Sequence, residues 1–299
     1  MPKPMSAKAL RGKPLAEKLL ASIRERAARI TQLRGSPPRL AILAIGGDSS
    51  SQVYLRSKLQ ACKEAGVETT VEALHAAVPE SDVLAILKDL ASDATLDGIM
   101  LEVPLPKGLD ARRIIDAICP DRDVEGVTTT NLGRLYSMKA FAELRSSGVL
   151  IPCTAGAAIR LLLETGMDPA GKSAVVVGRS RIVGRPAAHL LTCLDATVTL
   201  CHSKTRELAS HLSRADIVLS ATGVPGLIRG SHLKPGAVVL DAGIHVAGKT
   251  IEGDVEHEGA AKKASYLTPV PGGVGPLTVA CLLDNVTLSA ERRVKAQLG

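Results

Sequence analysis

Aromatic side chains are almost absent from this sequence of 299 residues, which contains three tyrosines, one phenylalanine and no tryptophan. Proteins that bind single-stranded nucleic acid use such side chains to stack against the bases. The formal net charge is +7, yet without stacking residues this charge is weak evidence for nucleic-acid binding. We expect no nucleic-acid partner, and the positive charge instead favours an anionic small substrate or cofactor.

Long hydrophobic runs are also missing. A membrane-spanning helix needs about 20 consecutive apolar residues, whereas runs such as 40–45 are typical of this sequence. The basic N-terminal stretch lacks the apolar segment of a signal peptide, and its residues Glu17 and Glu25 argue against a transit peptide. Since 45 % of the residues are apolar, the chain can build a large core. We therefore expect a cytoplasmic protein of about two domains, without a membrane partner.

Metal-ligand spacing is the third absence. None of the six cysteines forms a C-x-x-C pair or stands at zinc-finger spacing from a histidine. Most of them have apolar neighbours in the sequence and are interpreted as small core residues. We expect neither a disulfide framework nor a metal site.

The first half of the chain alternates between helix and strand patterns. Apolar residues at helical spacing predict a helix over 15–33, and the apolar run 40–45 is typical of a buried parallel strand. Further helices are predicted over 50–65, 82–90 and 111–118, and further strands over 67–74 and 98–103. This alternation predicts a parallel sheet.

The segment 120–152 breaks the alternation and is predicted to be a long irregular connection, with a domain boundary near 149–152. A second α/β unit follows. Its predicted helices cover 155–164, 183–194 and 207–212, and its predicted strands cover 173–177, 197–201, 217–221 and 237–241. A last helix is predicted over 279–297, after a Gly/Pro loop. The predicted fold class is α/β with two domains.

The second unit has the pattern of a dinucleotide-binding domain. The strand 173–177 runs through Gly178 into a helix start near Gly184, and such a turn lets backbone N–H groups approach a pyrophosphate. The glycine spacing is not G-x-G-x-x-G, so the prediction depends on the position after a buried strand. The next strand ends in CHSKT at 201–205, without the carboxylate that holds the ribose of NAD. This favours NADP, whose 2′-phosphate Arg179 could also reach; solvated turn residues are the alternative.

The first unit contains candidates for chemistry. Tyr54 and Lys58 stand four residues apart on a predicted helix and share one face, where a lysine can act as acid or base. Glu102 lies at the carboxyl end of a predicted parallel strand, the edge at which open α/β sheets bind ligands. Each also has a plain structural explanation, as an exposed lysine beside a half-buried tyrosine and as a surface glutamate. The charged turn 121–126 is by itself typical of a solvated surface.

A stiff loop with almost no side-chain bulk, PVPGGVGP at 269–276, precedes the last helix. Such a loop brings backbone close to a flat ligand, although an ordinary connector would have the same composition. The other motifs are SQVY at 51–54, PLP at 104–106, DV at 123–124, PCT at 152–154 and GRSRIVGRP at 178–186. Taken with this loop, and in their order along essentially the whole chain, these motifs closely resemble the methylenetetrahydrofolate dehydrogenase / methenyltetrahydrofolate cyclohydrolase family. The segments 178–186 and 268–278 are the most specific.

The resemblance implies a folate-binding catalytic domain over 1–150 and a Rossmann-type NADP-binding domain over 151–278. It also implies that the final helix, 279–299, packs back on the first domain, and that two chains form a homodimer through their cofactor domains. The implied substrates are tetrahydrofolate derivatives and the implied cofactor is NADP. The implied activities of one-carbon metabolism are oxidation of 5,10-methylenetetrahydrofolate to the methenyl compound, and hydrolysis of the latter to 10-formyltetrahydrofolate.

The resemblance also assigns roles to residues. Lys58 is implied as the acid/base lysine of the cyclohydrolase step, with Tyr54 beside it over the folate. The implied substrate-binding residues are Tyr54, Leu101, Glu102, Val103, Glu125, Pro271, Gly272, Gly273, Val274 and Gly275. The implied cofactor-binding residues are Gly178, Arg179 and Ser180 at the phosphates, Ser203 near the 2′-phosphate and Ile244 beside the nicotinamide.

Two departures from the family pattern lie at this chemistry. The family usually has glutamine at position 102 and aspartate at position 125, where this chain has Glu102 and Glu125. A carboxylate close to Lys58 favours the ammonium form and opposes its use as a base, so Glu102 is also counted as a catalytic residue. The extra methylene of Glu125 moves its carboxylate or the pterin ring. The alternative hypothesis is a variant with the dehydrogenase retained and the cyclohydrolase weakened, or with an altered folate substrate.

Two other protein classes, short-chain dehydrogenases and non-enzymatic NADP-binding regulators, explain fewer of these motifs. In short-chain dehydrogenases the Gly-rich turn precedes the Tyr/Lys pair, whereas here Tyr54 and Lys58 precede Gly178. A non-enzymatic NADP-binding regulator would not need Lys58, Tyr54 and the Gly-rich loop together. Binding of NADP without binding of folate would favour the regulator.

Overall fold

The computed structural model describes residues 6–47, 49–247 and 250–298, with the side chains at 49–54, 145, 247 and 298 left aside. The chain divides into two compact units. The three-stranded unit comprises Glu17–Leu135, Gly148–Ile151 and the described residues of Val279–Gly299. The six-stranded unit comprises the described residues of Met1–Ala16 together with Tyr136–Ser147 and Pro152–Thr278. Each is described by itself.

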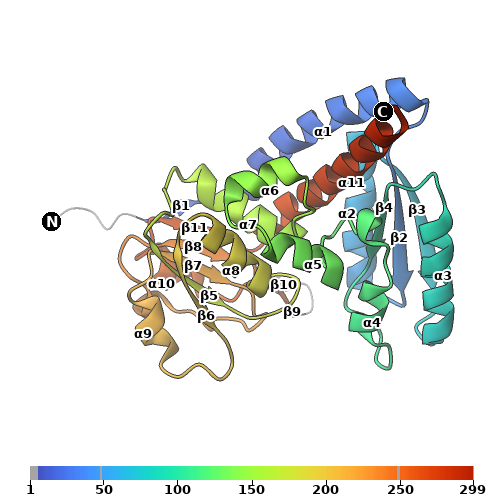
Figure 1. Cartoon of the computed structure of the whole chain (residues 1–299). Coiled ribbons are helices and arrows are strands. Elements are labelled where there is room, and N and C mark those ends of the chain that lie inside the picture. Colours follow the sequence, from blue (N-terminus) through green and yellow to red (C-terminus); the bar gives the residue numbers. More distant parts are fainter. Residues whose placement is uncertain (1–5, 48, 248–249, 299) are drawn as a thin grey trace. The chain divides into compact units, whose positions relative to one another are not determined.

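A small parallel sheet in the order β3-β2-β4 forms the centre of the three-stranded unit (Figure 1). Its strands are β2 (Arg39–Ile45), β3 (Glu68–Leu74) and β4 (Gly98–Leu101), close to the predicted ranges. The surrounding helices are α2 (Ser49–Ala65), α3 (Glu80–Ser92), α4 (Ala111–Asp116) and α5 (Thr129–Tyr136), with a short 3-10 helix η1 (Pro120–Arg122). Strands β2 and β4 are apolar because both of their faces are buried.

Two long helices have their larger parts in this unit, α1 (Gly12–Arg34) and α11 (Val274–Leu298). Their side chains are joined by ion pairs, in which Arg26 donates to Asp284 at 2.5 Å and to Glu291 at 2.9 Å. Apolar residues Ile30 and Val294 pack in the same cluster. The last helix begins at Val274 and not near 279 as predicted, since Pro276 falls in the first helical turn, where proline is tolerated.

The prediction of a long irregular connection over 120–152 is wrong. This segment forms η1, α5 and a further helix, α6 (Phe141–Ser147). These helices have at most eight residues each. The buried face of α5 contains only Asn131, Leu132 and Leu135, so the periodic apolar pattern is too brief to stand out in the sequence.

The six-stranded unit is a parallel sheet in the order β1-β11-β8-β7-β5-β6. Four strands confirm the predictions: β5 (Ser173–Val177), β6 (Thr197–Cys201), β7 (Ile217–Ser220) and β8 (Val238–Asp241). The edge is extended by two-residue strands, β1 (Lys8–Ala9) and β11 (Tyr266–Leu267), which the sequence did not reveal. Because β1 pairs with β11, the described residues before Glu17 are counted with this unit and not with the first domain predicted from the sequence.

The helices of the six-stranded unit include α7 (Cys153–Glu164), α8 (Gly184–Cys193), α9 (Leu208–Leu212) and α10 (His257–Ala261), with a 3-10 helix η2 (Gly230–His232). A separate antiparallel pair joins β9 (His245–Ala247) and β10 (Thr250–Glu252). The six-stranded parallel sheet, with a glycine turn after β5, confirms the predicted α/β class.

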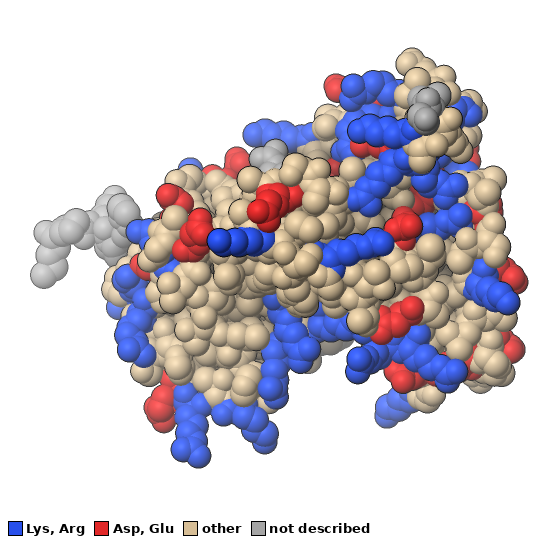
Figure 2. Space-filling model, in the orientation of Figure 1, with Lys and Arg blue, Asp and Glu red and all other residues tan. Residues whose placement is uncertain are grey.

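None of the helices within 6–47, 49–247 and 250–298 combines the length and the apolar character required to cross a membrane. On the face drawn in Figure 2, Lys and Arg side chains are spread widely, with Asp and Glu side chains among them.

Candidate active site

Lys58 and Glu102 form an ion pair in the three-stranded unit. Lys58 projects from α2, and Glu102 follows the last residue of β4. The lysine Nζ lies 2.7 Å from Oε1 and 2.8 Å from Oε2 of the carboxylate. Each side chain keeps about a fifth of its surface exposed, 20 % and 22 %. The contact that the sequence analysis considered is therefore present, at a site that solvent and ligands can still reach.

The strand edge explains the position of Glu102. Its backbone N–H donates to the carbonyl of Leu43 at 2.9 Å, so the parallel pairing continues for one residue beyond β4. The side chain of Leu101 is buried in the core, only 1 % exposed, and offers a ligand only its backbone. Val103 is 44 % exposed. At this edge the side chains of Glu102 and Val103 are available to a ligand.

Glu125 stands in a tight turn after η1, near the same two charged groups. Burial raises the pKa of its carboxyl to about 7. The positive charge of Lys58 acts against this rise, and the negative charges of Asp123 and Glu102 add to it. Near neutral pH a substantial fraction of Glu125 is therefore protonated, and the carboxyl can donate as well as accept a hydrogen bond.

Asp123 is fully buried beside this turn. Its Oδ2 accepts hydrogen bonds from the N–H of Thr128 at 2.8 Å and from Nδ2 of Asn131 at 2.9 Å. Its Oδ1 is buried without a hydrogen-bond partner within the described part of the chain. Asp123 thus fixes the start of α5 relative to the turn that carries Glu125.

Tyr54 was predicted to lie over the substrate next to Lys58. Its backbone belongs to α2, which keeps the predicted four-residue spacing from Lys58. Its side chain lies outside the described residues, so its role stays a prediction.

The Gly-rich loop at the start of α11 belongs to the six-stranded unit. Gly272 has a positive φ of 105°, and its carbonyl accepts a hydrogen bond from the N–H of Gly12 at 2.9 Å. A Cβ on Gly273 would lie 2.6 Å from the carbonyl oxygen of Pro269, so this position requires glycine. Pro271 and Gly275 are exposed, whereas Val274 is buried. The loop therefore presents backbone and proline rings to solvent, and its contact with a ligand stays a prediction.

The turn after β5 brings its backbone close to the start of α8. Gly178 has φ of 113°, and a Cβ at Gly184 would lie 2.0 Å from the carbonyl oxygen of Gly178. The hydroxyl of Ser180 accepts hydrogen bonds from the N–H groups of Val183 and Gly184, both at 3.2 Å, and so holds the turn against the start of α8. Arg179 is exposed next to it. Close backbone, a helix start and an exposed guanidinium fit the diphosphate of a dinucleotide.

The turn after β6, residues 202–205, contains no carboxylate. His202 and Thr205 close it with two hydrogen bonds, from N–H of His202 to the Thr205 hydroxyl at 2.9 Å and from N–H of Thr205 to the His202 carbonyl at 2.8 Å. Ser203 and Lys204 remain exposed at its tip. A hydroxyl and an ammonium at this place suit a 2′-phosphate.

At the carboxyl ends of β7 and β8 the structure reveals two buried carboxylates that the sequence analysis missed. Asp254 accepts hydrogen bonds from the Ser220 hydroxyl at 2.6 Å and from two backbone N–H groups, those of Thr222 and Val224. Asp241 accepts backbone N–H groups at 243, 254 and 255, and burial raises its pKa to about 6. The available signal was Asp241 itself, the last residue of a predicted strand.

Ile244 follows directly after this region and is 53 % exposed. An apolar side chain in solvent at the carboxyl edge of a parallel sheet is available to a planar ring. Its predicted position beside the nicotinamide stays a prediction.

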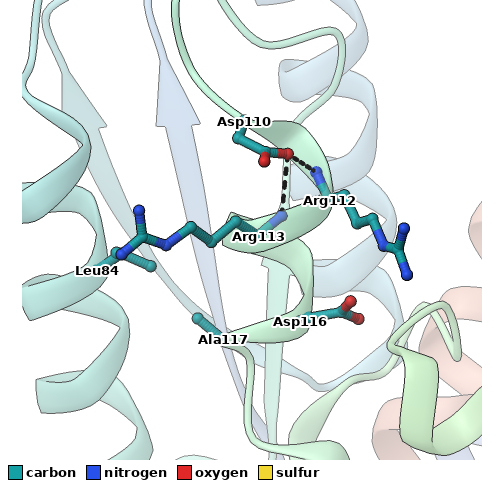
Figure 3. Close-up of a pocket in the computed structure, with 6 residues that line it drawn as sticks. All are labelled: Leu84, Asp110, Arg112, Arg113, Asp116 and Ala117. Atoms are coloured by element: carbon teal, nitrogen blue, oxygen red, sulfur yellow. Dashed lines mark hydrogen bonds between the residues drawn. The ribbon is translucent and has the colours of Figure 1, made fainter.

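A shallow hollow of about 530 Å³ lies elsewhere on the three-stranded unit, between α3 and α4 (Figure 3). Asp110 in its lining accepts hydrogen bonds from the backbone N–H groups of Arg112 at 2.9 Å and Arg113 at 3.2 Å. This is the cap of α4, and the residues that line the hollow include none of those predicted for the site.

Two family models match the chain. The model "Tetrahydrofolate dehydrogenase/cyclohydrolase, catalytic domain" matches residues 10–125, and "Tetrahydrofolate dehydrogenase/cyclohydrolase, NAD(P)-binding domain" matches residues 152–294. The chain belongs to the tetrahydrofolate dehydrogenase/cyclohydrolase family. The resemblance stated from the sequence motifs is thereby confirmed, and the six-stranded unit contains residues 152–278 of the NAD(P)-binding match.

Relatives match the chain from end to end. The bifunctional protein FolD of Moorella thermoacetica is 44 % identical over 291 residues, 97 % of this chain and all of that protein. Among solved structures, the bifunctional enzyme FolD of Campylobacter jejuni is 36 % identical with a TM-score of 0.89, over 96 % of this chain and 100 % of that one. The Trypanosoma brucei methylenetetrahydrofolate dehydrogenase-cyclohydrolase, solved with NADP cofactor and inhibitor, is 35 % identical with a TM-score of 0.90, over 99 % and 100 % of the two chains.

Proposed function

We propose that the chain oxidises 5,10-methylenetetrahydrofolate with NADP and hydrolyses the product, 5,10-methenyltetrahydrofolate, to 10-formyltetrahydrofolate. The observation that carries the proposal is Lys58, held 2.7 Å from Glu102 at the carboxyl edge of a parallel sheet, in a member of this family. Relatives named as bifunctional proteins, 44 % and 42 % identical, support both activities.

The cofactor half of the proposal depends on the turn after β5. Gly178, Arg179 and Ser180 would hold the diphosphate, and Ser203 the 2′-phosphate. When bound, NADP supplies the acceptor for the hydride. Hydride transfer mainly requires alignment of two flat rings, and the exposed backbone of the Gly-rich loop is suited to that task.

Hydrolysis needs more from the protein. The oxygen of a water forms a bond to the methenyl carbon, and the water loses a proton. The bond from that carbon to N5 then breaks, its electron pair goes to the nitrogen, and the nitrogen takes up a proton. The hydroxyl group loses its own proton to become the formyl carbonyl, so one proton is released in total. Lys58 is the residue proposed to carry protons between these atoms, and Glu102 sets how readily it does so.

The comparisons support the bifunctional activity and not the alternative of a weakened cyclohydrolase or an altered folate. We therefore treat Glu102 and Glu125 as substitutions that the bifunctional enzyme tolerates. Their effect on rate is a separate question, which substitution can answer.

We further propose that the active species is a cytoplasmic homodimer that associates through the NAD(P)-binding domains. The family resemblance is the support for this. Light scattering on the protein as it elutes from a size-exclusion column should give a mass near twice the chain mass of 31.1 kDa. A monomer mass would refute the dimer.

The activity is tested with purified protein in two spectroscopic assays. The first supplies 5,10-methylenetetrahydrofolate and NADP, and the second supplies the methenyl compound alone. Turnover in both supports the proposal, whereas turnover in neither refutes it.

A further inference from the structure

The turn that carries Glu125 is fastened through its backbone. The N–H of Val124 donates to the carbonyl of Arg122 at 2.9 Å, and the N–H of Gly126 donates to the carbonyl of Asp123 at 3.0 Å. Among the side chains that the structure describes, none donates a hydrogen bond to the carboxyl of Glu125. The backbone of the turn therefore decides where this carboxyl points.

Asn285, a buried residue in the middle of α11, holds that backbone. Its Nδ2 donates to the carbonyl of Val124 at 2.7 Å and to the carbonyl of Ile151 at 3.0 Å. The carbonyl of Val124 belongs to the peptide unit that also contains the nitrogen of Glu125. One amide group therefore orients the peptide directly before Glu125 and ties it to the segment before α7.

The turn has little room to absorb a shift. A Cβ on Gly126 would lie 2.6 Å from the carbonyl oxygen of Leu150, and a Cβ on Gly98 would lie 2.5 Å from Cγ1 of Val124. Packing this tight transmits a displacement of the backbone to its neighbours. A movement at Val124 is therefore passed on to Glu125.

We infer that Asn285 is a positioning residue for the folate substrate, which acts by fixing the peptide that carries Glu125. The inference rests on the proposed function for the identity of the substrate. It assigns a role in substrate binding to a polar residue in the middle of the last helix, which none of the motifs identifies.

Ser289 provides a matched control one helical turn further on. It is also buried, at 2 % exposed, and its hydroxyl also contacts two backbone carbonyls, those of Asp97 at 2.7 Å and Asp121 at 2.9 Å. Neither carbonyl adjoins Glu125. Asn285→Ala and Ser289→Ala each remove two hydrogen bonds from the same helix to backbone carbonyls. Only Asn285→Ala frees the peptide before Glu125.

The test measures the dissociation constant for tetrahydrofolate by calorimetry, and KM and kcat for the methenyl compound. We expect Asn285→Ala to raise the dissociation constant and KM about tenfold and to change kcat less than threefold. Ser289→Ala should change each value less than twofold. Equal effects of the two variants, or an unchanged dissociation constant in Asn285→Ala, would overturn the inference.

A conservative variant and a double-mutant cycle distinguish positioning of Glu125 from a merely structural effect. Asn285→Ser retains one donor and should give an intermediate dissociation constant. If Asn285 acts through Glu125, Asn285→Ala should change the dissociation constant little further in a Glu125→Gln background. A double variant whose increase in dissociation constant equals the product of the two single increases would contradict the inference. A wild type that binds tetrahydrofolate without turnover would refute the proposed function and still leave these binding measurements decisive.

Discussion

Replacement of Glu102 by glutamine should speed the hydrolysis step. The carboxylate of Glu102 contacts the ammonium group of Lys58 through both oxygens, at 2.7 and 2.8 Å. A glutamine has nearly the same shape and can still accept a hydrogen bond, but it carries no charge. The change therefore removes the ion pair while it leaves the packing of the site in place.

The magnitude follows from the geometry. Hydrogen bonds to charged groups contribute about 1.5–3 kcal/mol, and a neutral amide oxygen retains part of that. If the contact with Lys58 becomes weaker by about 1.4 kcal/mol and the barrier falls by the same amount, the rate rises tenfold. We expect Glu102→Gln to raise the cyclohydrolase rate at pH 7 about tenfold, because Lys58 then exchanges protons without first breaking an ion pair. The dehydrogenase rate should change less than threefold, since hydride transfer needs no proton carried by Lys58.

The assay follows hydrolysis of the methenyl compound by absorbance between pH 6 and 9, in parallel with reduction of NADP. Glu102→Asp retains the negative charge and should show no gain. Glu258→Gln is a matched control, because Glu258 accepts from Lys262 at 2.9 Å in an exposed ion pair, and this variant should behave as the wild type. An identical hydrolysis rate in Glu102→Gln, or a loss of hydrolysis, would refute the reasoning.

Three further predictions concern other parts of the molecule. Gly184→Ala should abolish NADP binding in a calorimetric titration, because its Cβ would lie 2.0 Å from the carbonyl oxygen of Gly178; micromolar affinity would contradict this. Asp254→Ala should lower the free energy of unfolding in urea by about 2–4 kcal/mol, since the buried Ser220 hydroxyl and two partly buried backbone N–H groups lose their acceptor; a loss below about 0.5 kcal/mol would contradict it. The pKa of Glu125 is raised from 4.5 to about 7, so its contribution to stability is full below pH 4.5 and lost as pH rises through 7. Glu125→Gln should therefore gain on the order of 3 kcal/mol relative to wild type between pH 4.5 and 8, and a constant difference would contradict this.

The sequence predicted the central strands of the sheets well because these strands are buried on both faces. Runs such as those of β2 and β5 are almost wholly apolar, a pattern that surface segments lack. The two-residue strands β1 and β11 were missed because they are too short to show any period. Helix α5 was missed for a related reason, since its buried face has only one turn and includes Asn131.

The candidate site was predictable in its residues and not in its energetics. The motif order placed Lys58 and Glu102 in one family site, and the structure brings their charged groups into contact. The raised pKa of Glu125 depends on burial and on three charges from separate segments, which no local pattern reveals. Asn285 was missed because a polar residue within a helix carries in the sequence no sign of the two carbonyls that it contacts.

The central claim is that one chain performs both reactions. The most direct measurement supplies the purified protein with 5,10-methylenetetrahydrofolate and NADP and then identifies the final folate product by chromatography. The account predicts reduced NADP together with 10-formyltetrahydrofolate, formed faster than the methenyl compound hydrolyses without enzyme. Reduced NADP with the methenyl compound hydrolysed only at the uncatalysed rate would contradict it.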